Sequence, residues 1–356
     1  MGKSRLLLFG LIGVSLAAQN KQPPAELPKF TGGVIEIEVP VSVHDRDGNT
    51  VNGLQPRQFR LLDNGKEQDI RVEATYHPLS LVICVQANAS MEAVLPQIQK
   101  IGSLLESIVI GDQGEAAVIA FDHRLQVLTG FTSEAAKVSE AFKKLKPGSS
   151  SSRQIDAVQQ AVRMLRSRPS SRRRVILSIA ETRDIASETR LREALIEAQV
   201  ANVTVYTVNV SRMITTLTGK PQPPRPDPLP PAARSMPSQV PATPDTVAQK
   251  SGQQGGSANF IPLLVEIFRD VKAIFVDNHA EAFTKATGGA EFSFVKQRGL
   301  EEAVGRIGED IHSQYLITYS PSNKEEGGFH EIRVLVDFPG VKVRTRPGYW
   351  LAAVVN

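Results

Sequence analysis

The chain has 356 residues and a formal net charge of +4, which is enough material for two modest domains or one large one. The near-neutral charge argues against a nucleic-acid-binding protein, because such proteins carry a strongly basic face. We interpret the local basic cluster at residues 172–174 as a solvated turn. The six histidines are scattered and the single cysteine, Cys84, lies in an apolar run, so we expect neither a histidine-based metal site nor an internal disulfide.

The first 17 residues are predicted to be a secretory signal peptide. Lys3 and Arg5 precede an apolar run from Leu6 to Ala18, and a basic start followed by an apolar core and small residues is typical of such peptides. The run is shorter than the ~20 apolar residues that span a bilayer, although a signal anchor is the alternative interpretation. We expect cleavage after Ala17 and export to the periplasm or the medium, with no transmembrane span left.

Residues 30–77 are predicted to form an antiparallel β unit. Residues 34–43 alternate apolar and polar side chains, which is the period of a half-buried strand, and residues 59–63 form a second strand. Asn64-Gly65 follows, a strong hairpin signal, so we expect residues 68–74 to return beside the second strand. A unit of this size buries little surface alone and needs a partner.

Residues 78–312 carry the pattern of an α/β domain. Continuous apolar runs, as expected of parallel strands covered on both faces, alternate with segments whose apolar residues fall at helical spacing. This alternation predicts a mostly parallel, doubly wound sheet with helices on both faces. We expect strands at 81–85, 116–121, 125–129, 175–179, 203–208 and 291–295, and helices at 91–108, 133–145, 155–165, 191–198, 261–287 and 300–312.

Residues 219–257 are predicted to be a disordered, proline-rich insertion in this domain. Ten of the 23 prolines lie between Pro221 and Pro244, and proline lacks the N–H that a packed helix or strand uses. The alternative to an inert insertion is a polyproline ligand, which the Pro-Pro pairs would offer.

Residues 313–350 return to β structure, with strands expected at 315–319, 329–338 and 341–346. Glu325 to Gly328 is expected to turn the first pair and Pro339-Gly340 the second. Two incomplete antiparallel units therefore flank one α/β unit. The predicted fold is a doubly wound, mostly parallel α/β domain inserted in a β-sandwich that N- and C-terminal strands build together.

The ligand crevice of such a sheet lies at the carboxyl ends of its strands. Gln86, Asn88 and Ser90 follow the first strand, Ser152 lies in a later loop, and Glu181 follows strand 175–179. At these positions the chain resembles the von Willebrand factor A (VWFA) family, whose sheet is Rossmann-like. In that family the first strand ends in Asp-x-Ser-x-Ser, which holds Mg²⁺ together with a Thr and an Asp from two other loops.

The resemblance implies a degenerate metal-ion-dependent adhesion site made of Asn88, Ser90, Ser152 and Glu181. Gln86 stands where the family has its leading Asp, which removes one negative charge from the site. Mg²⁺ prefers several oxygen ligands and compensating carboxylates, so we expect no tightly bound cofactor and leave weak Mg²⁺ binding open. The other interpretation is that these polar groups hydrogen-bond to one another.

The chain is similar, more narrowly, to the VWFA-related family found in Acidobacteria. The likeness covers residues 32–350, and the segments that carry it are EVPVSVHDRDGNTVNGL, FRLLDNGKEQDI, RRVILSIAETRD, YLITYSPSN and VKVRTRPGYW. It implies an architecture and export rather than a particular ligand.

The sequence contains no recognisable catalytic set. Ser90 has no nearby histidine and no Gly-x-Ser-x-Gly elbow, and we interpret Glu181 and Asp184 as loop residues rather than as an acid and a base. We predict a non-enzymatic, secreted binding or adhesion module that recognises a protein or surface ligand. The alternative is a structural or assembly component of the cell envelope with a vestigial site. The sequence leaves the ligand, the oligomeric state and the pathway undetermined.

Overall fold

The computed structural model describes most of the chain outside two long segments. Its described residues are 36–73, 77–105, 111, 113–181, 184, 186–210, 278–294, 297–323 and 325–351. The predicted signal peptide and the predicted proline-rich insertion lie outside these residues.

A six-stranded sheet forms the centre of the α/β unit, with strand order β10-β9-β8-β5-β6-β7. Neighbouring strands are parallel except β6 and β7, which are antiparallel. The chain builds outward from β5 in one direction, then returns to its other side with β8, so the strand order reverses between β5 and β8. The bounds are β5 Leu79–Gln86, β6 Glu115–Phe121, β7 Leu125–Thr132, β8 Arg173–Ala180, β9 Val203–Val210 and β10 Glu291–Phe294.

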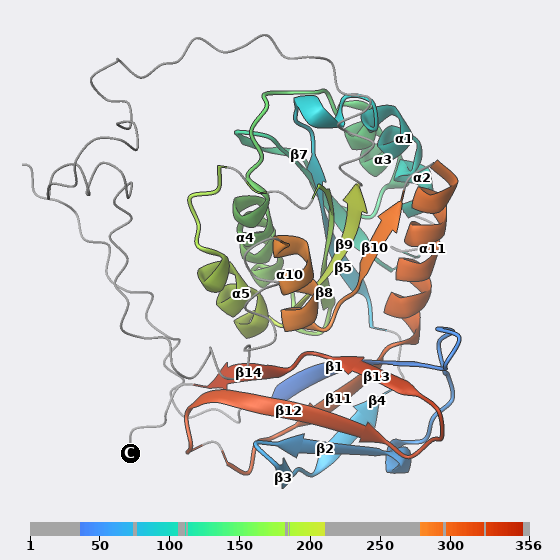
Figure 1. The fold of residues 1–356 in the computed structure, drawn as a ribbon, viewed down its shortest axis with the longest axis vertical. Helices are drawn as coiled ribbons and strands as arrows, with labels where there is room; N and C mark the ends of the chain where they lie inside the picture. The colour runs from blue at the N-terminus through green and yellow to red at the C-terminus, as the bar shows by residue number, and fades with distance from the viewer. Residues whose placement is uncertain are drawn as a thin grey trace, which may run out of the picture.

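Helices cover both faces of this sheet, as the alternating sequence pattern predicts (Figure 1). Successive residues of β5 belong to opposite layers: Leu81 and Ile83 pack with one set of helices, Val82 and Cys84 with the other. The first layer comprises α1 (Leu95–Lys100), α2 (Gly102–Leu105), α3 (Ala135–Lys143) and α11 (Gln297–Ser313). The second comprises α4 (Gln154–Arg166), α5 (Leu191–Val200) and α10 (His279–Thr287).

The second unit is a β-sandwich of two four-stranded sheets, ordered β13-β1-β11-β4 and β14-β12-β2-β3. N- and C-terminal strands pair directly within each sheet: Val39 lies opposite Ile317, and Leu61 opposite Val334. The prediction of a shared sandwich is confirmed. The strands are β1 Ile37–His44, β2 Phe59–Asp63, β3 Lys66–Glu67, β4 Ile70–Glu73, β11 Tyr315–Tyr319, β12 Gly328–Val336, β13 Lys342–Thr345 and β14 Gly348–Leu351.

The predicted hairpins of the sandwich are wrong in their partners. The turn at Asn64-Gly65 forms with positive φ at both residues, but the strand that returns from it beside β2 is the two-residue β3, and β4 joins the opposite sheet beside β11. Likewise β11, β12 and β13 are not neighbours, since each connection crosses from one sheet to the other, and a fourth strand, β14, completes the tail. The alternation of apolar and polar residues shows which face of a strand is buried, but it does not show which of the two sheets the strand joins.

Two predicted helices differ from the structure. The expected helix at 91–108 is divided into a 3₁₀ turn (Ala89–Met91), α1 and α2. Pro96 lies in the first turn of α1, where proline is tolerated because that N–H has no helical partner. Of the expected helix at 261–287, residues 279–287 form α10 and residues 261–277 lie outside the described residues.

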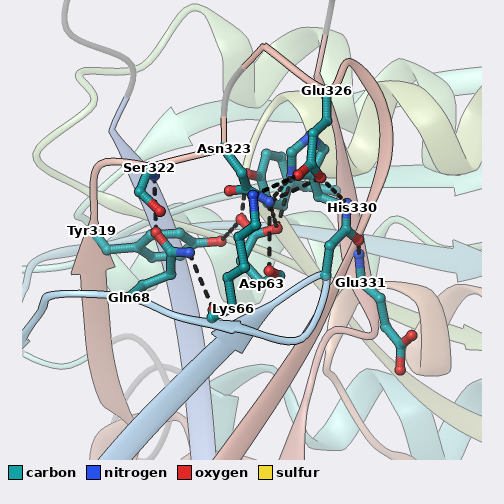
Figure 2. A network of polar contacts seen from close by, with 11 residues as sticks. Asp63, Lys66, Gln68, Tyr319, Ser322, Asn323, Glu326, His330 and Glu331 are labelled. Atoms are coloured by element: carbon teal, nitrogen blue, oxygen red, sulfur yellow. Dashed lines mark hydrogen bonds and ion pairs between the residues drawn. The ribbon is translucent and has the colours of Figure 1, made fainter.

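A buried carboxylate joins the two halves of the sandwich. Asp63 is fully buried at the end of β2 and accepts hydrogen bonds from His330 Nδ1 at 2.7 Å and Asn323 Nδ2 at 3.1 Å (Figure 2). Its second oxygen accepts from Tyr319 Oη at 2.8 Å and Tyr349 Oη at 2.7 Å. Every one of these partners comes from the C-terminal half, so one N-terminal side chain organises strands far away in the sequence.

A second buried carboxylate, Asp310 of α11, lies where the sandwich meets the α/β unit. It accepts a hydrogen bond from Tyr206 Oη of β9 at 2.5 Å, forms an ion pair with Arg344 of β13 and lies 3.3 Å from His44 Nε2. Burial alone would raise the pKa of Asp310, but the bonds with His44, Arg344, Tyr206 and Ser42 bring it below its ordinary value. The two units are therefore joined through a desolvated ionic contact.

The interpretation of residues 172–174 as a solvated turn is wrong. All three arginines are half-buried and use their guanidinium groups on the protein itself. Arg172 donates to the carbonyl of Leu79 at 2.8 Å, and Arg174 donates to the carbonyl of Ala201 at 3.0 Å. Arg173 bonds to α11 and Gln314. The cluster lies at the amino end of β8, which faces the sandwich, and it orders that junction.

Candidate functional site

The candidate site lies at the end of the central sheet that points away from the sandwich (Figure 1). Gln86 is the last residue of β5 and Glu181 directly follows β8. These strands are parallel neighbours, with Val85 opposite Ile179, so their carboxyl ends bring the two side chains together. This is also where the strand order reverses, the place at which open α/β sheets bind ligands.

Gln86 and Glu181 are joined by two hydrogen bonds. Gln86 Oε1 accepts from the backbone N–H of Glu181 at 3.0 Å, and Gln86 Nε2 donates to the Glu181 carboxylate at 3.2 Å. The Ser90 hydroxyl lies 2.8 Å from the same carboxylate oxygen and 2.8 Å from Asn88 Oδ1. A hydroxyl has one proton, so Ser90 donates to one of these two acceptors at a time. Four of the five predicted residues therefore form one polar cluster.

Ser152, the fifth predicted residue, stands apart from this cluster. Its side chain is 1% exposed, and its hydroxyl has no hydrogen-bond partner among the described residues. Its carbonyl accepts from Ala186 N at 3.0 Å, which anchors the loop after β8. A buried, unsatisfied hydroxyl is costly, so a ligand that hydrogen-bonds to the Ser152 hydroxyl would remove a destabilising contribution.

Asp122, which was not among the predicted site residues, connects the turn between β6 and β7 to the loop that contains Ser149. Asp122 directly follows β6 and accepts hydrogen bonds from Ser149 N at 2.9 Å and Arg124 N at 2.8 Å. Burial raises its pKa, but these bonds and His123 outweigh burial and lower it overall. A Cβ on Gly148 would lie 2.1 Å from the Asp122 carboxylate, so this loop requires glycine. The sequence does contain a signal for this residue, because Asp122 is an acidic residue directly after the strand expected at 116–121.

Asp156 and Asp184 hold the segment that follows β8 in place. Asp184 accepts from the N–H of Ile155 at 2.8 Å and from the Ser187 hydroxyl at 2.6 Å. Asp156 accepts from the backbone of Thr189 at 2.8 Å and pairs with Arg153 at 2.7 Å. Burial raises the pKa of Asp156, but these hydrogen bonds lower it overall. Both carboxylates are engaged by backbone and side-chain donors, which keeps the loop in place beside Glu181.

The side chains of the cluster do not fit a tightly bound hard cation. Mg²⁺ needs oxygen lone pairs and compensating negative charge, whereas Gln86 presents an N–H donor to Glu181, the one carboxylate among the five residues. A cation at that oxygen would have to displace the amide and the Ser90 hydroxyl. Across the described ranges, no group of three or more His, Cys, Asp or Glu residues is arranged to hold a metal ion.

Comparison with known families identifies the central domain. Residues 81–181, which run from within β5 to the residue directly after β8, match the profile of the von Willebrand factor type A domain. The chain thus contains a von Willebrand factor type A domain. The narrower likeness to the acidobacterial family stays a prediction. No curated protein matches the sequence.

Solved structures are similar to this chain at low sequence identity. BatB from Bacteroides thetaiotaomicron is 13% identical and has a TM-score of 0.39, covering 65% of this chain and 99% of its own. An aerotolerance-related membrane protein from Bacteroides fragilis is 11% identical with a TM-score of 0.40, over 65% of this chain and 98% of its own. The vWF domain of the pili tip protein Mfa5 from Porphyromonas gingivalis is 14% identical with a TM-score of 0.26, over 31% and 39%.

Proposed function

We propose that this protein is an exported, non-enzymatic binding module that captures a protein or surface ligand at the carboxyl ends of β5 and β8, without a tightly bound divalent cation. The observation that carries the proposal is the cluster in which Gln86 Nε2 and the Ser90 hydroxyl both contact the Glu181 carboxylate, at 3.2 Å and 2.8 Å. It supplies directed polar groups on rigid, buried strand ends, which is how a specific ligand is oriented.

The chemistry of the cluster favours binding over catalysis. A serine nucleophile needs an adjacent base that is itself oriented by a third group, and among the described contacts the Ser90 hydroxyl bonds only to Asn88 and Glu181. The Asp184 carboxylate already accepts a hydrogen bond from the N–H of Ile155 at the start of α4. The family match to a von Willebrand factor type A domain and the N-terminal sequence support a ligand-binding role outside the cytoplasm. In the described part of the chain, no helix combines the length and apolar character needed to cross a membrane.

The same hydrogen bonds support a second candidate function. Polar groups that satisfy one another are also what a vestigial site would retain, and the sandwich would then make the contacts of a structural or assembly component of the envelope. The two candidates differ in whether the polar cluster takes part in capture.

The test compares three forms of the protein as bait in its native extracellular or periplasmic extract. Wild type is compared with the triple variant Asn88→Ala, Ser90→Ala, Ser152→Ala, and with a matched control on exposed surfaces, Asn52→Ala, Gln126→Ala, Ser133→Ala. We expect the first variant to lose a partner that wild type and the control retain, with the melting temperature of each form recorded. Capture that survives the first variant would contradict the crevice as the binding site and favour the assembly role.

A further inference from the structure

A cavity with a basic lining lies at the opposite end of the α/β unit, against the sandwich. Its volume is about 120 Å³. The α/β unit contributes the arginines at 172–174 and the starts of β8 and β9, while Glu38 of β1 and Arg346, just after β13, come from the sandwich. Ser170 and Ser171, which are exposed, also line it and give it an opening to solvent.

Arg346 is buried in this cavity without a carboxylate partner. It is 3% exposed, and its Nη1 donates to Asn202 Oδ1 at 3.0 Å and to the carbonyl of Gln199 at 3.5 Å. Its Nε has no hydrogen-bond partner among the described residues. A buried charge that forms no ion pair is destabilising, so an anion beside Arg346 would stabilise the folded protein.

Arg174 repeats this arrangement on the other side of the junction. Its two terminal nitrogens donate to the carbonyls of Ala201 and Arg168, at 3.0 Å and 2.8 Å, and its Nε is also buried without a partner among the described residues. Burial lowers the pKa of both Arg174 and Arg346, which reflects the same desolvation. Arginine nevertheless stays protonated in proteins, so both positive charges remain.

Two acidic residues that contact the lining, Glu115 and Glu73, do not pair with these two arginines. Arg172 lies 3.2 Å from Glu115, and His77 lies 3.3 Å from Glu73. Glu38 is the acidic residue of the lining within the described chain, and its charge attracts both Arg174 and Arg346. No ion pair joins Glu38 to either of them in the described residues. Two unpaired guanidinium groups therefore face one carboxylate.

We propose that this cavity binds a free inorganic oxyanion of the phosphate or sulfate class through Arg346 and Arg174, and that the anion links the sandwich to the α/β unit. Guanidinium groups present paired N–H donors that match the oxygens of such anions. The volume fits, because cavities of about 150 Å³ accept benzene, which has more heavy atoms than phosphate. The site lies at the amino ends of β8 and β9, away from the Glu181 cluster.

The test measures the melting temperature of the full chain as inorganic phosphate replaces chloride at constant ionic strength. A ligand that binds the folded state raises the melting temperature with its concentration. We expect phosphate and sulfate to do so, and acetate to have little effect. Calorimetric titration of phosphate gives the dissociation constant directly. Equal melting temperatures in phosphate and chloride would overturn the proposal, as would an acetate effect equal to that of phosphate.

Three variants locate the site. Arg346→Gln should weaken phosphate binding by about tenfold or more, as expected for loss of hydrogen bonds to a charged group. Arg57→Gln removes the same charge from an exposed position and should leave the phosphate response unchanged. An unchanged response in Arg346→Gln would overturn the assignment.

Glu38→Gln keeps the test decisive even if Arg346→Gln does not fold. Removing the acidic residue of the lining makes the cavity more positive, so phosphate should bind several-fold more tightly than it binds to wild type. Arginines that act only as internal hydrogen-bond donors predict no change in the phosphate response of Glu38→Gln. That result would overturn the proposal.

Discussion

Gln86 and Glu181 hold each other across the carboxyl ends of two parallel strands, the amide accepting from the Glu181 N–H at 3.0 Å and donating to its carboxylate at 3.2 Å. An aspartate at position 86 could accept the first of these bonds but could not donate the second. Where the resembled family would place a cation between carboxylates, this chain places an amide that satisfies the carboxylate directly.

The Asp63 network should be a major source of sandwich stability. Asp63→Asn retains the shape but loses the negative charge that accepts four hydrogen bonds, each strengthened by that charge. We expect the free energy of unfolding to fall by about 2–4 kcal/mol, measured by urea denaturation. Glu67→Gln, which removes a charge from the exposed end of the same turn, should cost much less. Equal losses in the two variants would contradict this role.

Asp63 should also account for part of the loss of folding stability at low pH. Burial raises the pKa of Asp63, but hydrogen bonds from His330, Tyr349, Asn323 and Tyr319 lower it below the ordinary value of 3.8 overall. A lowered folded-state pKa stabilises the protein above the unfolded-state pKa, and this contribution is lost as the pH falls through the folded-state value. The stability difference between wild type and Asp63→Asn should therefore shrink below pH 3.8. A constant difference would refute the charge-based account.

Asp310 should contribute more to the free energy of unfolding than Glu309, its neighbour on α11. Asp310→Ala leaves Arg344 without its counter-charge and Tyr206 without its acceptor at a desolvated junction. Breaking a buried pair in this way costs about 3–5 kcal/mol. Glu309→Ala, at the exposed adjacent position, should change stability by less than about 0.5 kcal/mol. Urea unfolding of both variants checks the contrast, and similar losses would show that the junction contributes little.

Each half of the sandwich should depend on the other. Deletion of residues 315–350 removes the strands that pair with β1 and β2 and exposes their buried faces, including Val39 and Leu61. We expect the amides of β1 and β2 to lose hydrogen-exchange protection in this truncation. Protection that persists there would mean that the N-terminal strands fold without the C-terminal ones.

Much of the fold follows from the sequence pattern. The apolar runs at 81–85 and 175–179 match the cores of β5 and β8, and residues 59–63 and 315–319 match β2 and β11 residue for residue. Strand pairing in the sandwich was harder to predict. The turn at Asn64-Gly65 shows that the chain reverses direction, but it does not show how long the strand after the turn is. β14 was not predicted because it begins only three residues after the end of β13, just beyond the strand expected at 341–346.

The location of the candidate site could be predicted from the sequence, but most of its contacts could not. Strand ends gave Gln86 and Glu181, since parallel neighbours place their carboxyl ends together. The unpartnered Ser152 hydroxyl and the bracing role of Asp122 depend on how loops far apart in sequence pack. The arginines at 172–174 were misinterpreted for the same reason, because partners such as the carbonyls of Leu79 and Ala201 lie far from them in the sequence.

We propose that the Gln86 amide takes the place of a bound cation beside Glu181, and calorimetric titration with Mg²⁺ or Mn²⁺ tests this directly. Wild type should show no saturable heat at concentrations on the order of millimolar, while Gln86→Asp combined with Asn88→Ser should bind, because a second carboxylate restores the charge that such ions require. Glu181→Gln in the double variant should abolish that binding. Saturable binding by wild type that disappears in Glu181→Gln would contradict this role of Gln86.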